Sequence, residues 1–263
     1  MNLIKSNTLT GYLLMVIVSI LMLEPAYASI ENDNDAVNKS GKQRMLTQRM
    51  LKDYAMLGMG NTFGQPGEDL QQQIKLFDTS LHDLQQFNQN ASIAKSLIKT
   101  ETLWLPIKQQ LKKKPTIEAA ADLQKLLDDL LNSCHETTTL LVKMSGRDNS
   151  QIINISGRQR MLSQRLAALY MLKVWGINDD NFKQKLEQTM NDFSQAQKKL
   201  EASSHNTAQI KSSLQKVKKL FMWFELMANS TSGRYIPSLI SKSSDKINSE
   251  MNTVTKLYIQ VLK

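Results

Sequence analysis

A twelve-residue motif occurs twice in this chain of 263 residues, and the second copy begins 116 positions after the first. The two copies read Asn38-Lys39-Ser40-Gly41-Lys42-Gln43-Arg44-Met45-Leu46-Thr47-Gln48-Arg49 and Asn154-Ile155-Ser156-Gly157-Arg158-Gln159-Arg160-Met161-Leu162-Ser163-Gln164-Arg165. A repeat of this period indicates two copies of one whole domain, each large enough to hold a small core. Any site in one copy is therefore expected in nearly the same form in the other.

The similarity between the two halves extends well beyond the motif. At the same offset Tyr54 matches Tyr170, Gly60 matches Gly176, Phe77 matches Phe193, and Thr137 and Thr139 match Thr253 and Thr255. Between these blocks the offset slips by about three residues, which pairs Ile98…Trp104 with Val217…Trp223 and predicts a short insertion in an interhelical turn. We therefore place the two domains at residues 37–147 and 153–263.

The first 28 residues have the composition of an export signal. Lys5 supplies a positive charge, residues 11–23 form an unbroken apolar stretch, and Ala26-Tyr27-Ala28 is a small-x-small cleavage site. The apolar stretch is short for a membrane span, which needs about 20 residues. We predict a cleavable signal peptide, residues 1–28, and a periplasmic protein. The alternative is an uncleaved segment that anchors the chain to the inner membrane.

The composition argues against several classes of function. The formal net charge of +9 is scattered along helical segments, such as Lys112-Lys113-Lys114, without the interleaved aromatic residues typical of nucleic-acid binding. An excess of positive charge favours binding of small anions or of an anionic membrane surface. Cys134 is the only cysteine, which excludes an internal disulfide, and we expect it to be buried. The three histidines lack metal-ligand spacing, and no catalytic motif is present. We expect no enzymatic activity, no metal site and no cofactor, and a redox or metal carrier is disfavoured.

The chain is predicted to be all-α. Glycine and proline are rare and lie between periodic stretches rich in leucine, methionine, lysine and glutamine. The helices are predicted at residues 37–58, 68–88, 92–111, 116–144, 151–175, 180–202, 207–228 and 237–263. Pro106 should kink or shorten the third helix. Short connections predict two tandem antiparallel four-helix bundles. The joint at residues 144–153 is either a hinge or part of one continuous helix.

The first helix of each domain has an unusual outer face. At about 100° per residue, the side opposite the stripe of Leu46 and Met50 carries a glycine, an arginine, a glutamine and then apolar residues. In the first domain this far face consists of Gly41, Arg44, Gln48, Leu51 and Ala55, and in the second of Gly157, Arg160, Gln164, Ala167 and Met171. A solvated helix face would carry charged residues instead. This composition predicts a contact surface.

If the two first helices pack about a pseudo-two-fold axis, Arg44 and Arg160 approach each other across it. Two guanidinium groups in a partly dry interface repel each other and lose hydration unless something negative lies between them. A small planar oxyanion could bind both in bidentate fashion, and Gly41 and Gly157 would leave room for it. Alternatively, the arginines only cap backbone carbonyls or pair with a local carboxylate, such as Asp53 or Glu136.

Other polar residues of the motif are candidates for supporting roles. Gln48 and Gln164 could line the site or bond between helices, as could Gln43 and Gln159. Ser40 and Ser156 flank the arginine face with Thr47 and Ser163, and their hydroxyls could donate to an anion or, more commonly, bond back to the helix backbone. Arg49 and Arg165 lie off the far face and are expected to be structural.

The motif resembles the signature of the N-terminal domain of type IV pilus methyl-accepting transducers, a PilJ-type domain also called NarX-like. The second copy, Asn154 to Arg165, is similar almost residue for residue, and the first departs mildly at Lys39 and Lys42. The resemblance implies an extracytoplasmic four-helix sensor module. It also implies that the motif arginines, Arg44 and Arg160 here, hold nitrate or nitrite between two first helices, with Gly41 and Gly157 alongside. The pairing could form within one chain or between the chains of a homodimer.

Receptors of the resembling family continue into a second membrane span and a signalling domain. This chain ends at Lys263 after an amphipathic segment, so we expect it to signal through a membrane receptor or kinase. Our first hypothesis is a periplasmic protein that binds a small anion. The second is a ligand-free adaptor that uses the far face to contact a receptor, pilus or envelope component.

Overall fold

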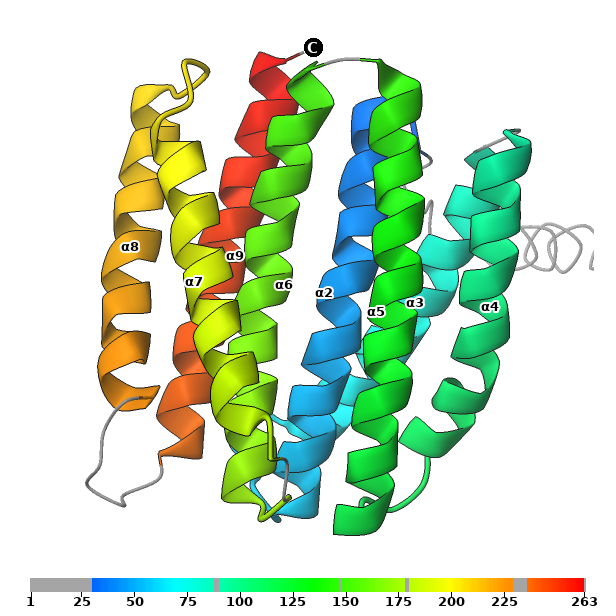
Figure 1. Ribbon diagram of the computed structural model, residues 1–263, viewed down its shortest axis with the longest axis vertical. Coiled ribbons are helices and arrows are strands. Elements are labelled where there is room, and N and C mark those ends of the chain that lie inside the picture. Colours follow the sequence, from blue (N-terminus) through cyan, green and yellow to red (C-terminus); the bar gives the residue numbers. More distant parts are fainter. Residues whose placement is uncertain (1–29, 88–89, 147, 178–179, 229–235, 263) are drawn as a thin grey trace, which may run out of the picture.

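The computed structural model describes residues 30–87, 90–146, 148–177, 180–228 and 236–262, and this part of the chain contains α-helices and no strand (Figure 1). The helices are α2 (Asp33–Gly58), α3 (Pro66–Phe87), α4 (Ala91–Leu111), α5 (Ile117–Ser145), α6 (Asp148–Val174), α7 (Phe182–Glu201), α8 (Ala208–Ala228) and α9 (Pro237–Val261). The all-α prediction is confirmed. The expected signal peptide, residues 1–28, lies outside the described residues.

The helices form two up-and-down bundles, α2 to α5 and α6 to α9, arranged side by side (Figure 1). In each bundle the first helix packs against the second and the last, and the third packs against the last. Helix α4 continues through Pro106 to Leu111, so the proline does not shorten the helix, and the alternative of a kink stays a prediction. None of the described helices combines the length and the hydropathy needed to span a membrane.

The two bundles meet along their first helices, which run parallel to each other (Figure 1). Residues at matched positions of the repeat face each other. The Ser150 hydroxyl donates to Asn34 Oδ1 at 3.0 Å, and seven residues further along, Gly41 faces Gly157. Contacts between equivalent residues place a pseudo-two-fold axis between α2 and α6. The copies therefore pair within one chain, and the far face of each first helix is buried in this contact.

The chain reverses direction at the joint between the bundles. Helix α5 ends at Ser145, Gly146 adopts a left-handed conformation with φ of 59°, and α6 begins at Asp148 and runs in the opposite direction (Figure 1). The Ser145 hydroxyl donates to Ser150 Oγ at 2.7 Å and so ties the two helix ends together. A glycine accepts this conformation without the steric cost of a side chain. Of the two alternatives for this joint, the continuous helix is wrong.

The buried aromatic pairs show how the second half of each repeat aligns. Trp104 packs on Phe77 with ring centroids 4.3 Å apart, and Phe221 stacks on Phe193 at 4.1 Å. Trp104 is therefore equivalent to Phe221, whereas Trp223 is 65% exposed. The predicted match of Trp104 with Trp223 is wrong, because it followed residue type and ignored the direction of the side chain.

Contacts of the last helices, α5 and α9, give the same alignment of the two copies as the aromatic pairs. The Ser40 hydroxyl bonds to Thr138 Oγ1 at 2.8 Å, and the equivalent Ser156 bonds to Thr255 Oγ1 at 3.0 Å. Thr138 thus matches Thr255, which corrects the predicted pairing of Thr139 with Thr255 by one residue. The second copy therefore carries one additional residue between α7 and α8, where about three were predicted.

The repeated glycines at the ends of the first helices have a local explanation. Gly60 and Gly176 both have positive φ, 69° and 91°. The residue after each glycine donates its amide back to the helix, Asn61 to Met56 at 2.9 Å and Ile177 to Leu172 at 3.0 Å. This is the Schellman type of helix end, which favours glycine in the left-handed position.

One buried ion cluster distinguishes the two bundles. Lys52 on α2 is 1% exposed and lies 2.9 Å from Asp245 on α9 and 3.5 Å from Asp53, measured from Nζ to carboxylate oxygens. Asp53 also accepts from Gln73 Nε2 at 2.5 Å, and burial raises its pKa. At the matched positions the second bundle has Ala168 and Leu169. The cluster is therefore a feature of the first copy that connects it to the second.

We predict that Lys52→Met lowers the free energy of unfolding by about 3 to 5 kcal/mol, because it leaves the carboxylate of Asp53 buried without its counter-charge. The double variant Lys52→Met/Asp53→Leu should lose less stability, since it also removes the stranded charge. It places at position 53 the leucine that the second copy has at the matched position, Leu169. Urea unfolding followed by circular dichroism measures both variants. An equal loss in the two would contradict this account.

Candidate functional site

The two motif arginines meet at the glycine contact between α2 and α6. A Cβ atom built on Gly41 would lie 3.3 Å from Nη2 of both Arg44 and Arg160, and 3.9 Å from the Cα of Gly157. A Cβ on Gly157 would lie 3.1 Å from Arg160 Nη2 and 3.5 Å from Arg44 Nη2. Both guanidinium groups therefore occupy space that the missing side chains leave open. The predicted approach of the arginines across the axis is confirmed, and so is the position of the glycines beside them.

Each arginine reaches across the axis to the opposite first helix. Arg44 Nη2 donates to Asn154 Oδ1 at 2.7 Å, and Arg160 Nη2 donates to the Asn38 carbonyl at 3.3 Å. Asn38 and Asn154 are matched positions at the start of the motif. The crossed hydrogen bonds repeat about the pseudo-two-fold axis and join the two copies.

The other end of each guanidinium contacts the last helix of its own bundle. Arg44 Nη1 lies 3.2 Å from His135 Nδ1 on α5, and Arg160 Nη1 donates to Asn252 Oδ1 on α9 at 2.9 Å. A guanidinium can only donate, so Nδ1 of His135 is the acceptor in this contact. The two half-sites thus have the same geometry but different partners, one titratable and one not.

No carboxylate neutralises these arginines within the described part of the chain. Asp53 is bound by Lys52 and Gln73, and Glu136 pairs with Lys99 at 2.9 Å. The alternative of a local carboxylate at Asp53 or Glu136 is therefore wrong, whereas capping of carbonyl oxygens does occur. The Nε atoms of Arg44 and Arg160 are buried and have no hydrogen-bond partner among the described residues.

Burial makes the charge of both guanidinium groups costly. Each arginine is 1% exposed. Burial lowers the pKa of Arg160 to about 9, with a further decrease from the charge of Arg44. Burial also lowers the pKa of Arg44 to about 10. Both shifts have the sign expected for cations that lack a nearby anion.

Two further cations flank the pair, again at matched positions. Lys42 on α2 lies near Arg160, and burial together with the charge of Arg160 lowers its pKa to about 8. Arg158 on α6, the equivalent residue, contributes with Arg44 to the lowered pKa of His135, although burial is the larger cause. Arg158 is itself paired with Asp192 at 2.7 Å. The positive potential at the axis is therefore reinforced from both bundles.

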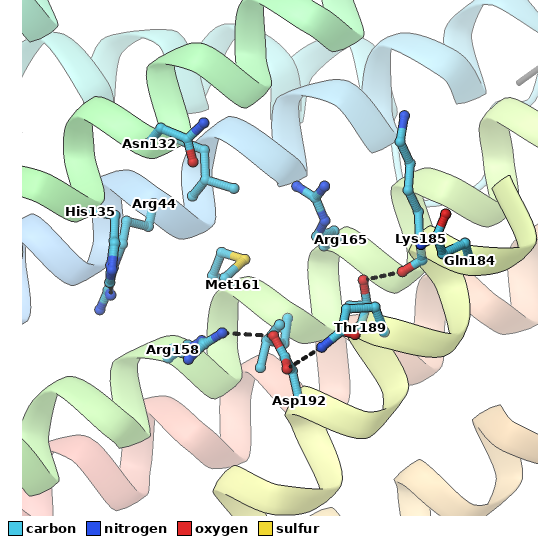
Figure 2. Close-up of a pocket in the computed structure, with 13 residues that line it drawn as sticks. Arg44, Asn132, His135, Arg158, Met161, Arg165, Gln184, Lys185, Thr189 and Asp192 are labelled. Atoms are coloured by element: carbon cyan, nitrogen blue, oxygen red, sulfur yellow. Dashed lines mark hydrogen bonds and ion pairs between the residues drawn. The ribbon is translucent and has the colours of Figure 1, made fainter. Parts of the chain in front are cut away.

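A cleft of about 420 Å³ reaches Arg44 from the side of the molecule where α5, α6 and α7 adjoin (Figure 2). Arg44 and His135 lie next to each other in it, and Arg158, Arg165 and Lys185 add positive charge to its walls. Its remaining lining residues are Leu131, Asn132, Met161, Leu162, Gln184, Gln188, Thr189 and Asp192. A small solute can therefore approach the buried arginine from this side.

Comparison of the sequence with known protein families finds one family twice, once in each copy of the repeat. The family model of the type IV pili methyl-accepting chemotaxis transducer N-terminal domain, PilJ, matches residues 26–130 and again residues 141–230. Each match contains one first helix with its motif. The chain belongs to this family. No curated protein and no solved structure gives a significant match.

The PilJ family consists of sensory domains, so its membership indicates a sensory role for this chain. Its domains lie in the N-terminal regions of chemoreceptors, which are typically periplasmic. The family is one of signalling domains and is not known for catalysis. Among the residues that the structure describes, no group of three or more histidine, cysteine, aspartate or glutamate side chains is arranged to hold a metal ion.

The hydroxyls of Ser40 and Ser156 are engaged within their own bundles, and a supporting role for them beside an anion stays a prediction. Their hydroxyls bond to Thr138 and Thr255, and Ser156 also donates to its own helix at the Ile153 carbonyl, 2.9 Å away. They fasten each first helix to the last helix of the same bundle. The similar hydroxyls of Thr47 and Ser163 donate to the carbonyls of Arg44 and Arg160.

The glutamines of the motif are buried, and among the described residues their hydrogen bonds go to partners other than Arg44 and Arg160. Gln164 Nε2 donates to Asp245 at 3.2 Å, and Gln48 Nε2 donates to Thr47 at 3.3 Å. Gln159 bonds to the Phe193 carbonyl at 3.1 Å, whereas both amide atoms of Gln43 are buried and unpartnered. A role for Gln48 and Gln164 in ligand binding stays a prediction.

The outer motif arginines are structural, as predicted. Arg49 pairs with Asp69 on α3 at 3.0 Å, and Arg165 pairs with Asp128 on α5 at 2.7 Å. Sequence reasoning missed Asn38 and Asn154, although their repetition at the start of the motif was a usable signal. It also missed His135 and Asn252, which differ between the copies and carry no such signal.

We predict that Lys42→Met stabilises the protein at pH 7 and that this advantage disappears between pH 8 and 10.5. In that window the unfolded chain holds a proton on Lys42 that the folded chain has lost, so the stability of the wild type rises relative to the variant. Urea unfolding at stepped pH measures the difference. The exposed Lys95→Met is the control, and a constant Lys42→Met advantage across this range would refute the assignment.

Proposed function

We propose that this PilJ protein is a periplasmic sensory protein that binds a small oxyanion, nitrate or nitrite, between Arg44 and Arg160. The observation that carries the proposal is a pair of buried guanidinium groups that face each other with no carboxylate beside them in the described part of the chain. A bound anion would remove the repulsion between them and offset the lost hydration. The unpartnered Nε atoms are available donors.

The space at the axis favours a small planar ligand. The first helices approach so closely that a Cβ atom on Gly157 would lie 3.9 Å from the Cα of Gly41 and 3.5 Å from Nη2 of Arg44, both on the opposite helix. A flat anion with two or three oxygen atoms can accept from two planar donor forks within such a gap. Lys42 and Arg158 would raise the local concentration of anions at the entrance.

Binding at this place would also provide a route for a signal. Arg44 and Arg160 donate across the axis to Asn154 and Asn38. An anion competes with these oxygen atoms for the same Nη2 groups, so its arrival exchanges hydrogen bonds between the helices for bonds to the ligand. The α2–α6 contact would therefore respond to occupancy, and we propose that a membrane receptor or kinase detects the change.

The first test is a thermal-shift series on the mature chain with nitrate, nitrite, chloride, sulfate and phosphate at equal ionic strength. A ligand at 100 times its Kd adds about 2.7 kcal/mol of stability, which corresponds to a rise in Tm of roughly 5 °C or more for a chain of this size. We expect this shift with nitrate or nitrite, and its loss in Arg44→Ala and in Arg160→Ala.

Arg49→Ala is the matched control. It removes an arginine of the same motif that pairs with a carboxylate, so it should lower Tm but keep the nitrate shift. A wild-type protein without any anion-selective shift would overturn the proposal. So would a shift that survives in both Arg44→Ala and Arg160→Ala.

One half-site contains the titratable His135 where the other has Asn252, and this difference predicts that anion binding depends on pH. Burial, together with the charges of Arg44 and Arg158, lowers the pKa of His135 below its ordinary value of 6.5. A bound anion would offset the arginine charges and raise this pKa, so protons should favour binding. We expect nitrate affinity measured by calorimetry to increase as the pH falls below 6.5, and to change less in His135→Asn, which copies Asn252. An identical pH profile in the two proteins would contradict this role.

One observation favours a second function, a ligand-free adaptor. Met222, Trp223 and Leu226 form an exposed apolar cluster on α8, of the kind that marks contact surfaces. The far face first considered for this role is buried between α2 and α6, so an adaptor would have to use another surface. Absence of an anion-selective shift, together with crosslinking to an envelope partner that Trp223→Ser abolishes, would favour this function.

A further inference from the structure

A second cavity lies away from the arginine pair, at the edge of the first bundle formed by α3 and α4. These two helices pack mainly on α2 and α5 and contact each other little. They leave a groove of about 610 Å³ between them. Leu57, Leu70, Ile74 and Leu111 supply its apolar lining. The groove shares no residue with the proposed anion site.

The rim of the groove is strongly basic. Lys75 and Lys108 lie along it, and Lys112-Lys113-Lys114 close it beyond the end of α4. The single acidic group in the lining is Asp78, which accepts from Trp104 Nε1 at 2.7 Å and from Lys108 Nζ at 2.5 Å. Its charge is therefore already compensated. The four remaining lysines give the rim a net positive charge that an anionic ligand would complement.

The size of the groove restricts what it can hold. Pockets for small molecules have volumes of about 300 to 1,000 Å³, and this groove, at about 610 Å³, falls within that range. A helical peptide is about 10 Å wide, and a stable protein partner covers about 800 Å² of surface. Four apolar side chains do not offer such an area. A single alkyl chain fits better.

The second bundle lacks the lysine cluster of the rim. At the positions matched to Lys112-Lys113-Lys114 it has Asn229-Ser230-Thr231. At the position matched to Leu57 it has Lys173, whereas Met190 keeps an apolar residue at the position matched to Ile74. The combination of an apolar lining with a rim of lysines is therefore specific to the first copy and is not a consequence of the shared repeat.

We propose that the α3–α4 groove binds a long-chain fatty acid anion. The alkyl chain lies against Leu57, Leu70, Ile74 and Leu111, and the carboxylate lies among the lysines at the end of α4. Burial of the methylene groups supplies most of the affinity, and the lysines select a negative head group.

Gly67 offers a way to close the groove without touching a lysine. A Cβ atom at this helical position would lie 3.5 Å from Leu57 Cδ2, an ordinary contact, so a larger side chain would extend into the lining. Isothermal calorimetry with dodecanoate below its micelle concentration is the direct test. We expect binding to wild type and at least about tenfold weaker binding to Gly67→Leu, which occupies space needed by methylene groups.

The head-group requirement is tested with a triple variant, Lys112→Gln/Lys113→Gln/Lys114→Gln, on surface residues whose replacement should not affect folding. It should bind dodecanoate about threefold or more weakly at low ionic strength. The control Lys198→Gln/Lys199→Gln/Lys219→Gln has the same net charge and exposed positions, and it should bind as wild type does. Butyrate and dodecyltrimethylammonium should not bind.

Equal binding of dodecyltrimethylammonium, or equal losses in the two triple variants, would overturn the proposal, as would unchanged binding in folded Gly67→Leu. No detectable dodecanoate binding to wild type would also overturn it. The Arg44→Ala variant should bind dodecanoate normally. That comparison separates failure of this site from failure of the nitrate proposal.

Discussion

The close contact between Gly41 and Gly157 is the constraint on which the rest of the structure depends. It brings the first helices together at matched positions and leaves space that the guanidinium groups of Arg44 and Arg160 occupy. Because the helices are parallel, each arginine donates across the axis to the matched asparagine of the other copy. A larger residue at either glycine would separate the helices and the charges together. The packing of α2 on α6 and the repulsion between Arg44 and Arg160 therefore both depend on this glycine contact.

The pseudo-symmetry is incomplete, and the differences are informative. His135 in one half-site is replaced by Asn252 in the other, and the buried Lys52–Asp53 pair is replaced by Ala168 and Leu169. A symmetric pair of separate chains would have to duplicate such changes. Tandem copies within one chain can diverge, so one half can acquire titratable groups or a lysine-rimmed groove while the other keeps only the shared motif.

Much of the fold could be predicted from local patterns. Helix bounds agree within a few residues, because periodicity, glycines and capping residues act over short distances. The far face was also recognisable, since a helix face exposed to water would carry charged residues where this one has a glycine, an arginine, a glutamine and apolar residues. The alignment of the later helices between the two copies could not be predicted. Trp104 aligned with Trp223 by residue type, yet it occupies the place of Phe221, because only packing shows which side of the helix faces the core.

The sequence by itself determined the duplication, the helical class and the pair of arginines that the repeat places on matched faces. Tertiary structure decided that the copies pair within one chain, that Asp53 and Glu136 are engaged elsewhere, and that Asn38, Asn154, His135 and Asn252 are the partners of those arginines. The physical reason is distance along the chain. A helix face follows from neighbouring residues, whereas the partners of a buried charge come from segments about a hundred positions away, brought together by packing alone.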